Sequence, residues 1–181
     1  SLAPPTVFLG LAILAVLLGH AYTSRAAASA LESGPSPEGQ PGLDWFYPSL
    51  ALDSAGVPHV SYWGKNVGND VRYASWGADE WEWSSAIADS SPEVGQSTSL
   101  AIDALDRPHI SYYAAESGDL RYAHWDGTQW SAETVDADGD VGSEYTSLQL
   151  DISGAPHISY YDATNGDLKY AFWDASQSQW S

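Results

Sequence analysis

After residue 44 the chain alternates between apolar and polar positions in short runs separated by Gly, Pro, Asn and Asp. In the run 109–114, Ile110 and Tyr112 share one face, while Ser111 and Tyr113 share the other. Alternation with a period of two is typical of a β-strand. Because both faces carry large side chains, we expect both to be covered.

This strand pattern occurs three times. The segment Pro-His-Val/Ile-Ser-Tyr-Trp/Tyr begins at Pro58, Pro108 and Pro156, so the copies recur every ~50 residues, a period typical of propellers and solenoids. Four strands are predicted in each copy; in the second copy they cover 99–103, 109–114, 119–125 and 130–135. Gly56 and Gly154 supply a positive φ before the Pro-His pair, and Asp106 takes that role in the second copy.

The sequence resembles bacterial and archaeal β-propeller repeats of this Pro-His-Ile-Ser-Tyr-Tyr kind. The resemblance implies that residues 44–181 form three blades, 44–95, 96–143 and 144–181, each a four-stranded antiparallel sheet. Propellers typically have four or more blades. The chain is therefore expected to be a piece of a longer protein, to pack its three blades openly, or to complete a ring with a neighbouring chain.

The first 33 residues have a different character. No charged side chain precedes Arg25, and the apolar stretch from Leu2 to Tyr22 reaches the ~20 residues that span a bilayer as a helix. Gly34-Pro35 ends the predicted helix, and residues 34–43 read as a Pro/Gly linker. The predicted fold class is mainly β, three four-stranded antiparallel propeller-like blades preceded by one long hydrophobic N-terminal α-helix (1–33).

Three interpretations of this helix remain open: a signal peptide, a membrane anchor, or the core helix of a filament. The segment resembles a type IV pilin N-terminus, although Pro5 replaces the glutamate of the bacterial pattern. The resemblance implies a basic leader removed before Ser1 and assembly of helices into a filament core. The expected assembly contacts are Val7, Phe8, Leu11, Leu14 and Leu18.

Composition narrows the classes of partner. The net charge is −18, with six Lys and Arg in total, so the surface repels phosphate backbones and nucleic-acid binding is excluded. Cysteine is absent, which excludes disulfides and thiolate chemistry. Nine Trp and eleven Tyr argue against a disordered chain.

No catalytic constellation stands out. His59, His109 and His157 occupy the same position in each repeat, so we expect them to be structural and to bond to backbone or to a neighbouring blade. A hydrolase triad needs one placed nucleophile with an oriented base, and threefold repetition fits architecture better. We expect no enzymatic activity.

One acidic loop resembles a calcium-binding segment. Oxygen-bearing side chains alternate through Asp136, Asp138, Asp140 and Glu144, as calcium ligands do. The loop lacks the sixth-position Gly and the twelfth-position Glu of an EF-hand, so a solvated acidic turn is the alternative. No other cofactor is expected.

The predicted function is that of a structural subunit of an extracellular, type IV pilus-like filament, with helices in the core and blades on the surface. Its expected partners are copies of itself through the helix, the membrane during biogenesis, and surface glycans. The alternative is a membrane-anchored surface propeller that binds glycans or matrix, with Trp and Tyr at blade rims stacking on sugars. Both place the protein outside the cell or on its surface.

Overall fold

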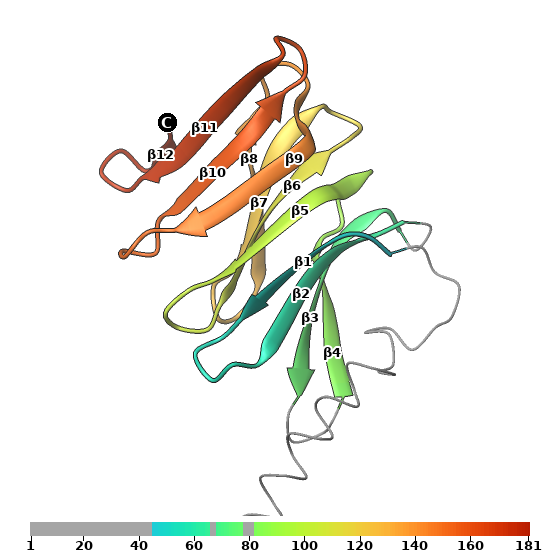
Figure 1. The fold of residues 1–181 in the computed structure, drawn as a ribbon, viewed down its shortest axis with the longest axis vertical. Helices are drawn as coiled ribbons and strands as arrows, with labels where there is room; N and C mark the ends of the chain where they lie inside the picture. The colour runs from blue at the N-terminus through green and yellow to red at the C-terminus, as the bar shows by residue number, and fades with distance from the viewer. Residues whose placement is uncertain (1–44, 66–67, 78–81) are drawn as a thin grey trace, which may run out of the picture. The chain divides into compact units, whose positions relative to one another are not determined.

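The computed structural model describes residues 45–65, 68–77 and 82–181, and within them the chain forms three four-stranded antiparallel sheets (Figure 1). Blade 1 contains β1 (Trp45–Leu52), β2 (Pro58–Gly64), β3 (Asp70–Gly77) and β4 (Glu82–Asp89). Blade 2 contains β5 (Val94–Ile102), β6 (Pro108–Ala114), β7 (Asp119–Trp125) and β8 (Trp130–Asp136). Blade 3 contains β9 (Val141–Leu150), β10 (Pro156–Asp162), β11 (Asp167–Asp174) and β12 (Gln179–Trp180). The predicted mainly-β class with three such sheets is confirmed.

The turn between the first two strands of each blade is built around an aspartate. In blade 2 the Oδ1 atom of Asp103 accepts hydrogen bonds from the amides of Leu105 (2.9 Å) and Arg107 (2.8 Å). Asp53 and Asp151 make the same turn in the other blades. The predicted positive φ is present, at 78° for Gly56, 84° for Gly154 and 60° for Asp106.

The first strand of blade 2 is longer than predicted. It begins at Val94 instead of residue 99, and its pairing with β6 shifts register between Val94 and Gln96 and again between Gln96 and Ser99. Ser97 has a φ of 54°. Such bulges add residues that break the two-residue alternation, so the sequence pattern marks only the regular half of the strand.

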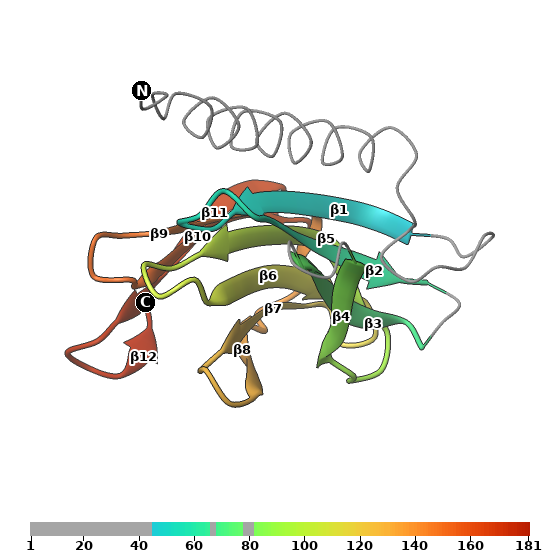
Figure 2. The same cartoon turned by 90° about the horizontal axis from the view of Figure 1, so that it is seen from below.

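The blades pack face against face, with the first strand of each blade next to the first strand of the following one (Figures 1 and 2). All seven residues of β6 are buried, which confirms that both faces are covered. The blade 1–2 core centres on Ile110 and Tyr112, and the blade 2–3 core on Leu120 and Leu148. A hydrogen bond from the Leu148 amide to Ser99 Oγ (3.0 Å) joins β9 to β5.

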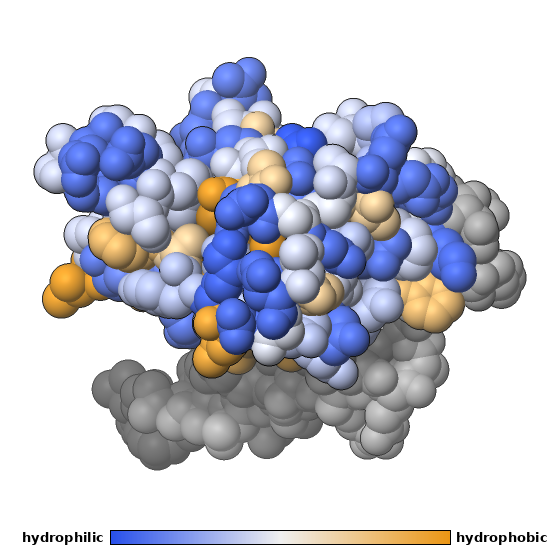
Figure 3. Space-filling model, turned by 90° about the horizontal axis from the view of Figure 1, so that it is seen from above, coloured by the Kyte–Doolittle hydropathy of each residue, from blue (hydrophilic) through white to orange (hydrophobic). Residues whose placement is uncertain are grey.

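The predicted helix (1–33) and linker (34–43) lie outside the described residues, as do Val7, Phe8, Leu11, Leu14 and Leu18. The filament contacts therefore stay predictions. The described ranges contain no helix with the length and apolar character that crossing a membrane requires. On the face shown in Figure 3 hydrophilic residues dominate and hydrophobic ones form separate patches.

Candidate functional site

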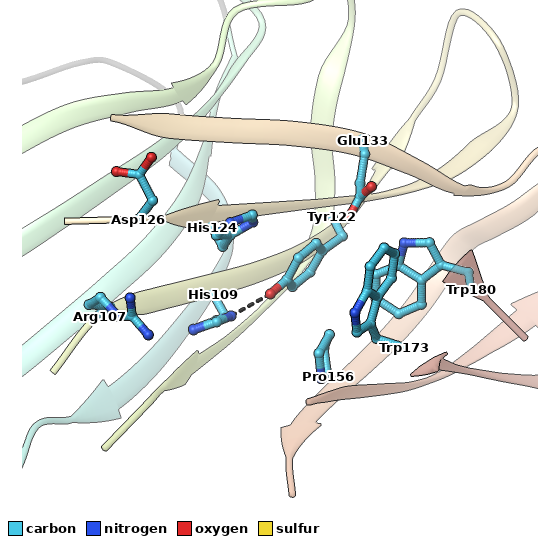
Figure 4. Close-up of a pocket in the computed structure, with 9 residues that line it drawn as sticks. All are labelled: Arg107, His109, Tyr122, His124, Asp126, Glu133, Pro156, Trp173 and Trp180. Carbon is cyan, nitrogen blue, oxygen red and sulfur yellow. Dashed lines mark hydrogen bonds between the residues drawn. The ribbon is translucent and has the colours of Figure 1, made fainter. Parts of the chain in front are cut away.

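A pocket of about 320 Å³ opens between blades 2 and 3 (Figure 4). Blade 2 and its turns contribute the polar side of the lining, and blade 3 contributes most of the apolar side. The lining residues are Arg107, His109, Tyr122, His124, Asp126, Glu133, Pro156, Trp173 and Trp180.

Three aromatic rings form the apolar side of this junction pocket. The ring of Trp180 on β12 meets Tyr122 edge to face, with centroids 5.3 Å apart and an interplanar angle of 71°. It meets Trp173 in the same way at 5.7 Å and 74°. Because each ring is held by another, the apolar faces have fixed orientations, which favours a ligand with a flat apolar side.

Arg107 supplies the cationic group and is itself held in place. Its Nε lies 2.7 Å and its Nη2 2.6 Å from Asp103 Oδ2. Burial alone would raise the pKa of Asp103, but hydrogen bonds from the Arg107 side chain and from the turn amides outweigh it and lower the pKa to about 2. The pair therefore stays ionised at neutral pH, and the positive charge of Arg107 is largely offset.

His109 lines the pocket as part of a polar stack. Its Nδ1 bonds to the Tyr122 hydroxyl, its Nε2 is 3.5 Å from Asp103 Oδ2, and its ring stacks on His124 with centroids 5.9 Å apart. Burial lowers the pKa of His109, and Asp103 only partly opposes this effect, so the ring is neutral at pH 7. The buried atoms His109 Nε2, His124 Nδ1 and Trp180 Nε1 have no hydrogen-bond partner among the described residues.

The same Asp–His–Tyr arrangement recurs in every blade. His59 bonds to Tyr73, and His157 bonds to Tyr170; Asp53 and Asp151 lie 3.4 and 3.7 Å from the respective Nε2 atoms. A structural role for the three repeated histidines is therefore supported by their contacts. Their partners are side chains of their own blade rather than the backbone or neighbouring blade that we had expected.

The blade 1–2 junction has the same aromatic framework but a less polar lining. Trp130 meets Tyr73 at 5.3 Å and Trp125 at 5.9 Å. The positions that align with Arg107, His124, Asp126 and Glu133, however, hold Val57, Ser75, Gly77 and Ala86. These four departures from the repeat distinguish the junction pocket from its counterpart.

Arg107, His124 and Glu133 were not singled out from the sequence. The candidate residues of the sequence analysis are residues that recur, whereas these residues interrupt the recurrence. Comparing aligned positions of the three copies for a polar residue that replaces a small or apolar one would have found them.

The predicted calcium residues lie at the end of β8 (Asp136), on the β8–β9 connection (Asp138 and Asp140) and near the start of β9 (Glu144). Asp136 Oδ2 is 2.5 Å from Lys169 Nζ and accepts a 2.7 Å hydrogen bond from the Tyr160 hydroxyl. Asp138 and Asp140 are exposed, as is Glu144 on β9. No cluster of three or more potential metal ligands occurs in the described part of the chain, so calcium stays a sequence-based prediction.

No family model matches the sequence, and no curated protein matches it. Among solved structures, the chain is similar to a fucose lectin from Kordia zhangzhouensis in complex with methyl-fucoside, with a TM-score of 0.50 and 22% identity over 74% of this chain and 95% of the lectin. It is also similar to AofleA from Arthrobotrys oligospora, with a TM-score of 0.53 and 12% identity over 81% of this chain and 47% of that one. At these identities the likeness shows the fold alone.

Proposed function

We propose that this protein is a surface carbohydrate-binding protein that holds one sugar unit of a glycan in the junction pocket. The observation that carries the proposal is the departure from the repeat. Arg107 and Glu133 line the same pocket as a Trp pair, whereas the aligned positions at the other junction are Val57 and Ala86.

The chemistry of the pocket matches the two kinds of surface that a sugar presents. The guanidinium of Arg107 donates hydrogen bonds and the carboxylate of Glu133 accepts them, so hydroxyl groups find both kinds of partner. Trp173 and Trp180 cover the apolar C–H face of the ring. A cavity of about 320 Å³ is small for a pocket, at the lower end of the ~300–1,000 Å³ typical of ligand sites.

Charge favours a neutral sugar over an anionic one. Asp103 offsets the charge of Arg107. Hydrogen bonds from the Thr128 hydroxyl and from the amides of Gln129 and Thr128 lower the pKa of Asp126 to about 2, so this lining residue is ionised. Together with a net charge of −18, this makes the pocket repel sialylated or sulfated glycans.

One carboxylate of the pocket is held in its ionised form. Asp126 Oδ1 accepts hydrogen bonds from Thr128 and Gln129, which lower the pKa of Asp126 to about 2. Asp126 is therefore not suited to be the general acid with a raised pKa that glycoside hydrolysis uses. A Hadza microbial sialidase matches at a TM-score of 0.49 and 15% identity, too low to carry an argument. That the chain is not an enzyme stays a prediction.

The lectin from Kordia zhangzhouensis, described as bound to methyl-fucoside, makes that glycoside the first probe. A protein of this kind is expected at the cell surface or outside the cell, in agreement with the alternative interpretation of the sequence. The filament interpretation depends on residues outside the described ranges and is not needed for this proposal.

The proposal is tested on a panel of immobilised neutral and anionic glycans that includes methyl-fucoside. We expect the wild-type chain to bind neutral members, and Arg107→Val to bind them at least ~10-fold more weakly, since a hydrogen bond to a charged group contributes ~1.5–3 kcal/mol. Valine is what the chain itself places there in blade 1, so the fold tolerates it.

The matched control is Val57→Ala, at the aligned position of the other junction. It should bind as the wild-type chain does. No binding by the wild-type chain to any neutral glycan, or equal binding by Arg107→Val, would contradict the proposal.

A further inference from the structure

The two end faces of the three-blade array expose apolar side chains. The aligned side chains at the internal faces are buried under the neighbouring blade. On the last blade, Leu168 is 82% exposed and Tyr170 57% exposed. The aligned residues of blade 2, Leu120 and Tyr122, are 0% and 4% exposed because blade 3 packs on them. The blade 3 face is thus built like a face that receives another blade.

Blade 1 presents the complementary surface. Leu50 on β1 is 64% exposed, whereas the aligned Leu100 and Leu148 are 6% and 1% exposed against the preceding blade. The described three-blade array therefore carries both halves of an inter-blade junction, one at each end. The same apolar surface is buried against a neighbouring blade in two blades and exposed in the remaining one. We expect the exposed copy to pack against a blade as well.

We infer that two copies of this chain associate head to tail, with blade 1 of one copy packed on blade 3 of the other. The inference does not depend on the proposed glycan function. Because the partner surfaces are different, such a contact is heterologous and closes only when it forms a ring. Two of the described three-blade arrays together supply six blades, within the ~4–8 that propellers use.

The contacts of the new junction follow from the two junctions already present. The amides of Leu100 and Leu148 donate to Ser49 Oγ and Ser99 Oγ, each at 3.0 Å. By the same register, the amide of Leu50 is placed to donate to Ser147 Oγ of the second copy. Ser147 is exposed in the single chain.

A hollow is present where the Leu50 side chain would enter. It has a volume of about 290 Å³ and is lined in part by Ser147, Tyr160 and Leu168. Leu148 occupies the corresponding place at the blade 2–3 junction, in contact with the cluster that contains Leu120. The hollow and the exposed leucine therefore match in position and in chemistry.

The aromatic contact repeats as well. Tyr73 meets Trp130 and Tyr122 meets Trp180, both with centroids 5.3 Å apart. Tyr170 and Trp83 hold the same positions at the two ends, and we expect them to meet across the new junction. One hydrogen bond of the existing junctions has no counterpart at the new one. Thr98 and Thr146 donate to carbonyl oxygens of the preceding blade, whereas blade 1 has Pro48 at that position.

The inference is tested by the mass of the full chain in sedimentation or light-scattering measurements over a range of concentrations. At a salt concentration of ~0.15 M or higher, which screens repulsion between two acidic copies, the wild-type chain should reach the mass of two copies. Leu50→Asp and Leu168→Asp should each remain single, because each breaks both junctions of a ring. An equal mixture of the two variants should associate again, since one junction is then intact.

Leu105→Asp serves as the control, because Leu105 is a 70% exposed leucine in a turn of blade 2. It should associate as the wild-type chain does, and circular dichroism should show all variants folded. The inference is overturned if the wild-type chain stays single. That holds both when the end faces are left to solvent and when residues 1–44 cover them. Association that survives either single aspartate variant also overturns it, because the contact is then not head to tail.

Discussion

At the residue scale, two kinds of position carry different roles. The residues that repeat, such as Asp103, His109 and Tyr122, lie against one another in each blade and support its structure. The residues that depart from the repeat, Arg107 and Glu133, have no counterpart at the blade 1–2 junction. Recurrence therefore marks architecture in this chain, and its interruption marks the candidate binding site.

The Asp103–Arg107 pair makes a prediction about pH. The pKa of Asp103 is about 2 in the folded chain, against an ordinary value of 3.8. Its contribution to stability is therefore complete above pH ~4 and is lost as the pH falls toward ~2, because the unfolded chain binds the proton first. In urea unfolding followed by tryptophan fluorescence, Asp103→Asn should be less stable than wild type at pH 7 and should lose less stability between these pH values. An identical pH dependence in the two proteins would show that Asp103 is not perturbed.

At the element scale, the burial of the third strand of each blade depends on whether another blade follows it. Leu120 on β7 and Leu168 on β11 are aligned, but only Leu120 is covered by a following blade. Local sequence is thus the same while burial differs, so the end faces are defined by the order of the blades and not by the strands themselves.

This difference predicts unequal effects of one substitution. Leu120→Ala should lower the free energy of unfolding by ~2–5 kcal/mol, since it leaves a cavity in a closed core. Leu168→Ala should change it by less than ~0.5 kcal/mol when the chain is dilute enough to be single. Chemical denaturation of the two variants measures both values, and equal effects would contradict the described blade order.

Much of the fold could be predicted from sequence because turns and alternation are local. Gly56, Gly154 and Asp106 mark the positive-φ turns, and the repeat gives the four strands per blade. The bulged start of β5 could not be predicted, since Ser97 interrupts the alternation. The junction pocket could not be predicted either, because Trp173 and Trp180 of blade 3 meet Arg107 of blade 2 only after the blades stack.

At the scale of the whole molecule, association of two copies would strengthen glycan binding. A head-to-tail pair would carry one junction pocket per copy, and two linked sites hold a glycan-coated surface more tightly than either site alone. The new junction itself would lack the polar set, because Ala155 and Phe172 stand where blade 2 has Arg107 and His124. The filament and anchor interpretations of residues 1–33 remain predictions and are compatible with a paired, outward-facing binding domain.

Arg107, His124, Asp126 and Glu133 are proposed to convert an ordinary blade junction into a sugar site. The most direct test is the number of neutral glycosides bound per chain, measured by isothermal titration of the wild type and of the variant Val57→Arg/Ser75→His/Gly77→Asp/Ala86→Glu, which copies these residues into the blade 1–2 junction. We predict one site in the wild type and two in the variant. Two sites in the wild type, or one in a correctly folded variant, would contradict the claim.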